Sequence, residues 1–273
     1  MSEPEDTQPV FPPEIEEIIF SLCLHNELED SKNVVLVAKR VYEWMKPQLY
    51  KVAIVHYDKT YYGRPKITSE LLKIHGHLIR HILHWITTSD SEACFQQPAT
   101  CLSLCSNVVD IALWDAETIY DEVLIDRLLA LRLTHLSFDV TRFHLGLTKC
   151  SITKRVAFIF ITHLDLQGMA VGVQVGVMKG YFPSLTHMAL NEERKLPAQA
   201  ILDCWGNQLE VLIWYINTSS GHSTDSLPKD LRVVVIDQSC EYVHDWHEAT
   251  KGGPSSVWRR AEGEVKRRRA DGI

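Results

Sequence analysis

The sequence has no long hydrophobic run of the kind that crosses a membrane. Its longest apolar stretches, such as residues 156–161, are far shorter than the roughly 20 residues that a helix needs to span a bilayer. The chain opens on acidic residues, whereas a secretory signal opens on a basic and then an apolar segment. We therefore expect a soluble protein of the cytoplasm or the nucleus, with no membrane partner.

Basic residues are missing from the first part of the chain. No Lys or Arg precedes Lys32, whereas nine Asp or Glu lie within the first 30 residues, and the whole chain has a net charge of −7. This balance does not favour nucleic-acid binding. Residues 1–10 are polar and acidic, and residues 248–273 end in a basic cluster, so we predict that both segments are disordered. The basic segment is either a nuclear import signal or a frayed helix end.

Catalytic and cofactor motifs are also missing. The chain contains no G-x-S-x-G, no G-x-x-x-x-G-K-[ST] and no G-x-G-x-x-G sequence. Its seven cysteines are an odd number without a signal segment, which favours free thiols. His77 and His81 have helical spacing but no evident third ligand. Cys101 and Cys105 could form a split zinc site with Cys240, His244 and His247, but the spacing of these residues is not that of known zinc motifs. We expect a non-enzymatic protein with no catalytic residue, cofactor or metal.

Two short amphipathic helices are predicted near the N-terminus. Pro13 suits the first turn of a helix, because that position has no N–H to satisfy. Ile15, Ile18, Ile19 and Leu22 then recur at helical spacing.

A second apolar stripe runs from Val34 to Met45, with Ser31 or Asn33 as its cap and Pro47 as its end or kink. Two short helices cannot bury both stripes alone. Residues 11–50 therefore have the pattern of a docking module.

One apolar pattern recurs beyond residue 75. It consists of an apolar residue, two residues, an apolar residue, one residue and a final apolar residue. The six copies are Val108-x-x-Ile111-x-Leu113, Leu133-x-x-Leu136-x-Phe138, Ile161-x-x-Leu164-x-Leu166, Leu185-x-x-Met188-x-Leu190, Leu209-x-x-Leu212-x-Trp214 and Leu231-x-x-Val234-x-Ile236. Successive copies start 25, 28, 24, 24 and 22 residues apart, and a weaker copy starts at Ile79. Such a period is typical of leucine-rich repeats.

The repeated pattern predicts an α/β fold over residues 51–247. Each apolar triple suits a short strand, and stacked units would place the strands side by side in a parallel sheet, as in a leucine-rich-repeat-like solenoid. Residues 196–206 and 117–131 are candidate helices between strands. The asparagine that usually follows the triple is missing from most units, so an irregular α/β arrangement is the alternative.

Three of the units share a Thr-His pair. The pairs are Thr134-His135, Thr162-His163 and Thr186-His187, each directly after the first apolar residue of its copy. Equivalent places in a stack of repeats would line these side chains up. They form either a polar ladder that binds a partner or simply the repeated solvent-facing residues of the units.

The N-terminal sequence resembles the F-box motif. Residues 11–19 read FPPEIEEII, in which a hydrophobic residue and prolines precede a glutamate and an apolar helix, as at the start of that motif. Residues 37–44, VAKRVYEW, resemble its closing helix. Together with the repeats, residues 36–50 and 76–81 look like the F-box and leucine-rich-repeat proteins that are numerous in mushroom-forming fungi.

This resemblance implies an adaptor function. F-box proteins dock on a Skp-type subunit of a cullin-based ubiquitin ligase and hold a protein substrate on their repeats. The corresponding docking residues here are Phe11, Pro12, Pro13, Ile15, Ile18, Ile19, Val37, Val41 and Trp44. Residues 26–31 lack the leucine-rich middle portion of a typical box, which makes the apolar footprint smaller. The alternative is a repeat-based scaffold whose degenerate box recruits no ligase.

Overall fold

The structure is a computed structural model of the chain. It describes residues 11–26, 33–34, 36–56, 67–85, 97–114, 120–149, 158–167, 175–191, 198–216, 227–237, 242–253 and 255–272. The predicted disorder of residues 1–10, the candidate cap Ser31 and the thiol of Cys240 lie outside these residues. None of the helices among the described residues is long and apolar enough to span a bilayer.

The centre of the molecule is an eight-stranded parallel sheet. Its strands are β1 (Val52–His56), β2 (His81–Trp85), β3 (Asp110–Leu113), β4 (His135–Asp139), β5 (His163–Gln167), β6 (His187–Asn191), β7 (Val211–Ile216) and β8 (Val233–Asp237). Every strand pairs in parallel with the next one along the chain, so the spatial order is the chain order. The prediction of an α/β chain with a parallel sheet is therefore confirmed.

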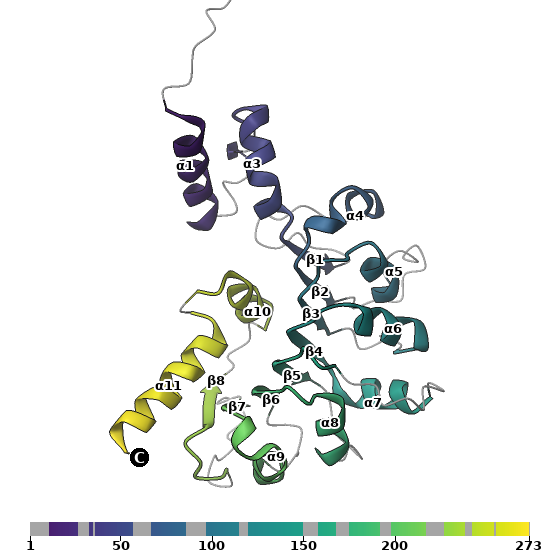
Figure 1. Ribbon diagram of the computed structural model, residues 1–273, viewed down its shortest axis with the longest axis vertical. Coiled ribbons are helices and arrows are strands. Elements are labelled where there is room, and N and C mark those ends of the chain that lie inside the picture. The colour runs from purple at the N-terminus through teal and green to yellow at the C-terminus, as the bar shows by residue number, and fades with distance from the viewer. Residues whose placement is uncertain are drawn as a thin grey trace, which may run out of the picture.

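Helices between the strands cover one face of the sheet, which we call the outer face (Figure 1). They are α4 (Ser69–His75), α5 (Pro98–Ser103), α6 (Glu122–Ala130), α7 (Val140–Lys149), α8 (Val175–Tyr181) and α9 (Ala198–Trp205). Thr68 and Asp121 cap α4 and α6 through their side-chain oxygens. Gly206 follows α9 with a φ of 55°, a backbone conformation that favours glycine. The predicted helix at 196–206 is confirmed, whereas α6 starts later than the predicted helix at 117–131.

The repeated apolar pattern supplies the core under these helices. Side chains alternate between the two faces of a strand, and the second and fourth positions of β3 to β7 point to the outer face. There they form one continuous core with the helices, and its largest fully buried side chains include Phe138, Phe143 and Phe182. The weaker copy at Ile79 also belongs to this core.

The sixth copy of the pattern differs from the prediction by one residue. Leu212 of β7 pairs with Val233 of β8, so Val233 continues the outer row where Val234 was expected. Val234 and Ile236 lie on the opposite face, which we call the inner face. Because β8 is apolar on both faces, its sequence does not show which residues belong to the outer row.

Two longer helices precede the sheet among the described residues, and residues 33–34 between them are helical as well. The first, α1 (Pro13–Asn26), begins at the predicted proline. The second, α3 (Lys39–Leu49), begins several residues later than expected and continues two residues past Pro47. Its N-cap Ala38 has an extended backbone. The two helices pack on each other beside the β1 end of the sheet (Figure 1).

Two further helices cover the inner face. Helix α10 (Tyr242–Lys251) places Val243 and Trp246 against β1 to β3. Helix α11 (Val257–Asp271) buries Val257, Ala261 and Val265 against β6 to β8. The prediction of a disordered basic tail over 248–273 is therefore wrong for α11. Apolar residues at four-residue spacing pack on the sheet. Four of the five arginines are exposed, and the fifth, Arg268, donates to the main-chain carbonyl of Val233 on β8.

Candidate functional site

The N-terminal helix α1 turns the side chain of Glu16 toward α3. The carboxylate of Glu16 is almost fully buried and accepts hydrogen bonds from Nε and Nη2 of Arg40 at 3.1 and 3.2 Å. The small core between the helices consists of Val41 and Met45, with Phe20 packed against them. An ion pair and a few α3 side chains thus hold the inward side of α1.

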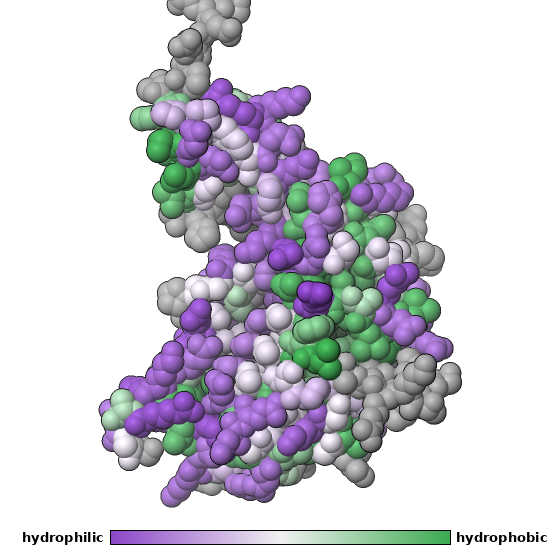
Figure 2. All heavy atoms as spheres, in the orientation of Figure 1, coloured by the Kyte–Doolittle hydropathy of each residue, from purple (hydrophilic) through white to green (hydrophobic). Residues whose placement is uncertain are grey.

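The apolar stripe of α1 faces outward. We use the name N-terminal apolar surface for seven exposed side chains: Phe11, Ile15, Ile18, Ile19, Leu22, Leu36 and Val37. Ile18 exposes 55% of its surface, and Leu22 exposes 62%. Figure 2 shows the apolar patch along the α1 side of the molecule. An amphipathic helix normally buries its apolar stripe against its own core, so this orientation leaves a surface that a partner would cover.

The structure leaves most of the predicted docking residues exposed. Phe11, Pro12, Pro13, Ile15, Ile18, Ile19 and Val37 are exposed. Trp44 is half-buried, and Val41 is 1% exposed, so Val41 supports the surface from beneath and touches no partner. Leu36 was missing from the predicted set because it lies outside the stripe expected for the second helix.

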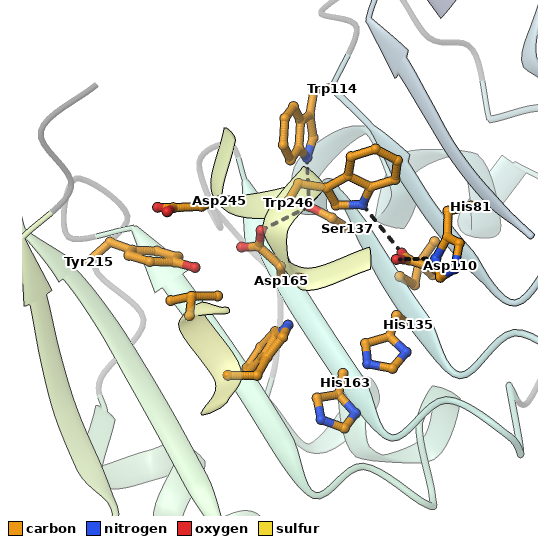
Figure 3. A pocket seen from close by; sticks show the side chains of 14 residues that line it. His81, Asp110, Trp114, His135, Ser137, His163, Asp165, Tyr215, Asp245 and Trp246 are labelled. Carbon is orange, nitrogen blue, oxygen red and sulfur yellow. Dashed lines mark hydrogen bonds and ion pairs between the residues drawn. The ribbon is translucent and has the colours of Figure 1, made fainter. Parts of the chain in front are cut away.

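A second candidate site lies on the inner face, between α10, α11 and the middle of the sheet. It is a cavity of about 70 Å³, lined by the first position of β3 and by the first and third positions of β4 and β5 (Figure 3). We call it the polar cleft. The outer-facing positions of β3 to β5 are apolar, so the polar groups of these strands lie at inner-facing positions.

Hydrogen bonds fix the acidic groups of the polar cleft. Asp110 lies 3.1 Å from Nδ1 of His81, and it accepts a longer bond of 3.4 Å from the indole of Trp246. Asp165 accepts from Ser137 Oγ at 3.1 Å and from Gln167 Nε2 at 3.0 Å. Burial raises the pKa of Asp165 to about 6, although both hydrogen bonds oppose this rise.

Histidines from consecutive strands stack beside this network. His135, His163 and His187 occupy the first positions of β4, β5 and β6, and neighbouring ring centroids are 4.2 Å apart. Burial lowers the pKa of all three rings, and the pKa of His163 falls to about 2. The histidine column is therefore neutral at ordinary pH.

The threonine before each histidine makes a matching contact. Thr134, Thr162 and Thr186 each place their hydroxyl 2.8 to 2.9 Å from Nδ1 of the following ring. Each hydroxyl also donates to a main-chain carbonyl of the preceding unit, at 3.2 to 3.3 Å. The Thr-His pairs thus occupy equivalent places, as predicted.

The prediction that these pairs face solvent is wrong at the β6 end. His187 is buried, and the indole of Trp258 on α11 packs edge-on against both His163 and His187, with ring centroids at 5.1 and 6.1 Å. The sequence did not indicate this cover, because α11 was expected to be disordered.

Among the described residues, the candidate metal ligands named from the sequence form no group of three. His77 lies in a short 3-10 helix and His81 starts β2, so the two rings do not share a helix face. Cys101 and Cys105 are buried in the outer core, and burial raises the pKa of both thiols to about 12. Such protonated thiols are poor metal ligands and nucleophiles.

No family model matches the sequence, and no curated protein matches it significantly.

Proposed function

We propose that this chain is a non-enzymatic adaptor that binds a Skp-type subunit of a cullin-based ubiquitin ligase through its N-terminal apolar surface. One observation carries the proposal: the apolar stripe of α1 points away from the rest of the described molecule while its Glu16 points inward. The resemblance of residues 11–19 and 37–44 to the F-box motif names the partner.

The energetics of the surface favour a partner. Burying a large aliphatic side chain contributes about 1.5 to 3 kcal/mol, so several such residues on one helix are costly to leave in water. Contiguous apolar patches on soluble proteins usually mark interaction sites. The Glu16–Arg40 ion pair supports the proposal as well, because it holds the outward orientation of α1 in the unbound chain.

The regular geometry of the strands supports a leucine-rich-repeat-like solenoid as the second part of the adaptor. Where a strand begins, two consecutive N–H groups donate to one carbonyl of the preceding unit. Thr162 and His163 use the carbonyl of Thr134 in this way, and the next pair uses the carbonyl of Thr162. In the proposed adaptor, the solenoid holds a protein substrate on the part of its surface that α10 and α11 leave uncovered.

The test is a binding assay between the full chain and a fungal Skp-type subunit. Ile18→Asp places a charge in the middle of the N-terminal apolar surface. Ile74→Asp is the matched control, because Ile74 is also a helical isoleucine, with 61% exposure on α4. We expect the wild type and Ile74→Asp to bind, and Ile18→Asp to bind at least about tenfold more weakly.

Two results would count against the proposal. Equal binding of Ile18→Asp and the wild type would place the interface elsewhere. An absence of binding by the folded wild type would leave a repeat-based scaffold that recruits no ligase. Circular dichroism of each variant shows whether its fold is intact.

A further inference from the structure

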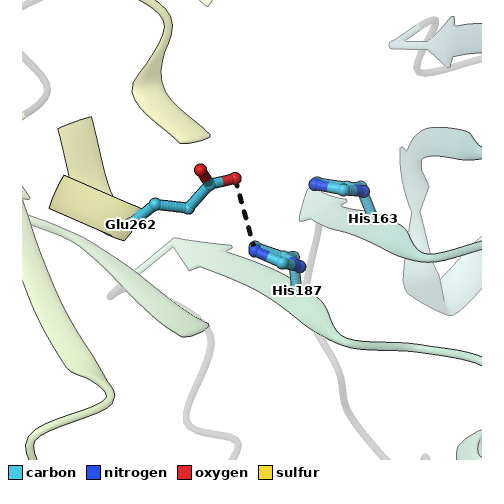
Figure 4. Close-up of side chains that lie close together, drawn as sticks. All are labelled: His163, His187 and Glu262. Carbon is cyan, nitrogen blue, oxygen red and sulfur yellow. Dashed lines mark ion pairs between the residues drawn. The ribbon is translucent and has the colours of Figure 1, made fainter. Parts of the chain in front are cut away.

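The β6 end of the histidine column meets a carboxylate from the C-terminal helix. Glu262 on α11 points toward the rings of His163 and His187 (Figure 4). The three side chains each offer one ligand atom, and these atoms all lie within 4.8 Å of one another. Among the described residues, this group alone meets that criterion for three metal-binding side chains.

One ring nitrogen of this group has no hydrogen-bond partner in the described part of the chain. His187 is 7% exposed, and its Nε2 is fully buried without a hydrogen bond. The nearest carboxylate oxygen, Oε1 of Glu262, is 3.6 Å away, which is too far for a hydrogen bond. A buried polar atom in this position calls for a ligand, because leaving it unpaired costs about 1 to 3 kcal/mol.

The threonines favour the ring tautomer that binds metals. The hydroxyl of Thr186 donates to the carbonyl of Thr162, so its oxygen is available to accept from the Nδ1–H of His187. Only the tautomer with hydrogen on Nδ1 uses both contacts at once, and it leaves a lone pair on Nε2. Thr162 stands in the same relation to His163. In most histidines that bind a metal, the other ring nitrogen donates its N–H to an acceptor, and this hydrogen bond orients the ring.

The environment of Glu262 also suits coordination. Oε2 of Glu262 lies 3.9 Å from Nη1 of Arg259, and Oε1 faces the histidine rings. Two imidazole nitrogens and a carboxylate oxygen are ligands that Zn²⁺ accepts, and three protein ligands leave a fourth position for water. Trp258 covers the rings on the same side of the sheet.

We propose that His163, His187 and Glu262 bind one Zn²⁺ ion and that this ion fastens α11 to the sheet. The ligands come from two strands and from a helix far along the chain. Coordination therefore adds to the contacts that α11 already makes with the sheet through Val257, Ala261, Val265, Trp258 and Arg268. Zinc bonds to nitrogen and oxygen of about 2.0 to 2.2 Å require the three atoms to approach one another. The two stacked rings therefore tilt toward the ion when it binds.

The experiment is a zinc titration of the full chain after chelator treatment, followed by calorimetry. We expect one Zn²⁺ per chain. Glu262→Gln keeps the shape of the side chain and removes its charge, and it should weaken binding at least about tenfold. His77→Ala is the matched control, because His77 is an exposed histidine outside the group, and this variant should bind as the wild type does.

A second variant tests the role of the threonines. Thr186→Val removes the acceptor for Nδ1 of His187 without touching a ligand atom, and it should weaken zinc binding about 10- to 100-fold. Co²⁺ in place of Zn²⁺ gives a spectroscopic signature, because tetrahedral coordination produces strong visible absorption that a loosely bound surface ion lacks. No stoichiometric binding by the folded wild type, or equal affinity for the wild type and Glu262→Gln, would overturn the proposal.

Discussion

The two faces of the sheet are built differently. On the outer face, side chains from every unit and from α4 to α9 form one apolar core. On the inner face, two separate apolar clusters lie under α10 and α11, and the polar cleft lies between them. The outer face is therefore held together unit by unit along the chain, whereas the inner face depends on helices that arrive from the C-terminal end. Local patterning determines the first face, and long-range packing determines the second.

The largest expected effect comes from a cavity in the outer core. Phe138→Ala removes a fully buried ring that packs against Tyr120, Phe143 and Phe182. We expect the free energy of unfolding to fall by about 3 to 5 kcal/mol. Denaturant unfolding followed by circular dichroism measures the change. A loss below about 1 kcal/mol would mean that the outer face is not one continuous core.

A smaller and more local effect is expected on the inner face. Ala261 of α11 is fully buried against the sheet, and Ala261→Asp places a charge there without a partner. We expect α11 to detach at a cost of at least about 2 kcal/mol, while the sheet and the outer helices stay folded. Hydrogen exchange should become fast in 257–271 alone. Equally fast exchange in β3 to β5 would contradict the separation of the two faces.

The histidine column makes stability depend on pH. His135, His163 and His187 have folded-state pKa values below 6.5, so the unfolded chain binds more protons as the pH falls through that value. Stability is full above pH 6.5 and decreases progressively below it. Between pH 7.5 and 5.5 the ring of His163, whose pKa falls to about 2, should cost about 1 kcal/mol, and the other two rings act in the same direction.

Asp165 acts in the opposite direction over this range. Its pKa is raised to about 6, so its protonation favours the folded chain and offsets about 1 kcal/mol of that loss. Denaturant unfolding of chelator-treated protein at the two pH values tests the sum. His163→Asn should reduce the pH dependence, and an identical dependence in that variant would show that the column does not cause it.

The smallest expected effect is on the stability of the N-terminal helices. Ile18 is exposed and lies outside both faces of the sheet, so Ile18→Asp should change the free energy of unfolding by no more than about 0.5 kcal/mol. Thermal unfolding provides the measurement. A clear destabilisation would mean that the stripe of α1 packs within the molecule in solution.

The outer face could be predicted from the sequence because its pattern is local. Positions two residues apart in each strand are apolar, and they recur at a nearly constant period, so Leu136 and Leu164 were assigned correctly to successive strands. The pattern failed only at β8, where both faces are apolar and Val233 replaces Val234 in the outer row.

The inner face could not be predicted in the same way. Its cover depends on α11, whose arginines suggested a solvated tail. Arg267 and Arg268 are paired with Glu264 within the helix, and three small apolar residues four positions apart do the packing. The spacing of Val257, Ala261 and Val265 was the available signal. The third ligand, Glu262, could not be found without placing that helix against the sheet.

The most direct test of the proposed adaptor function is a hydrogen-exchange footprint of the chain with and without a saturating Skp-type subunit. The proposed function predicts added protection in peptides covering residues 11–26 and 36–49, with unchanged exchange in α10 and α11. Protection confined to the sheet or to the C-terminal helices, or no added protection at all, would contradict the claim that the N-terminal apolar surface is the ligase-binding site.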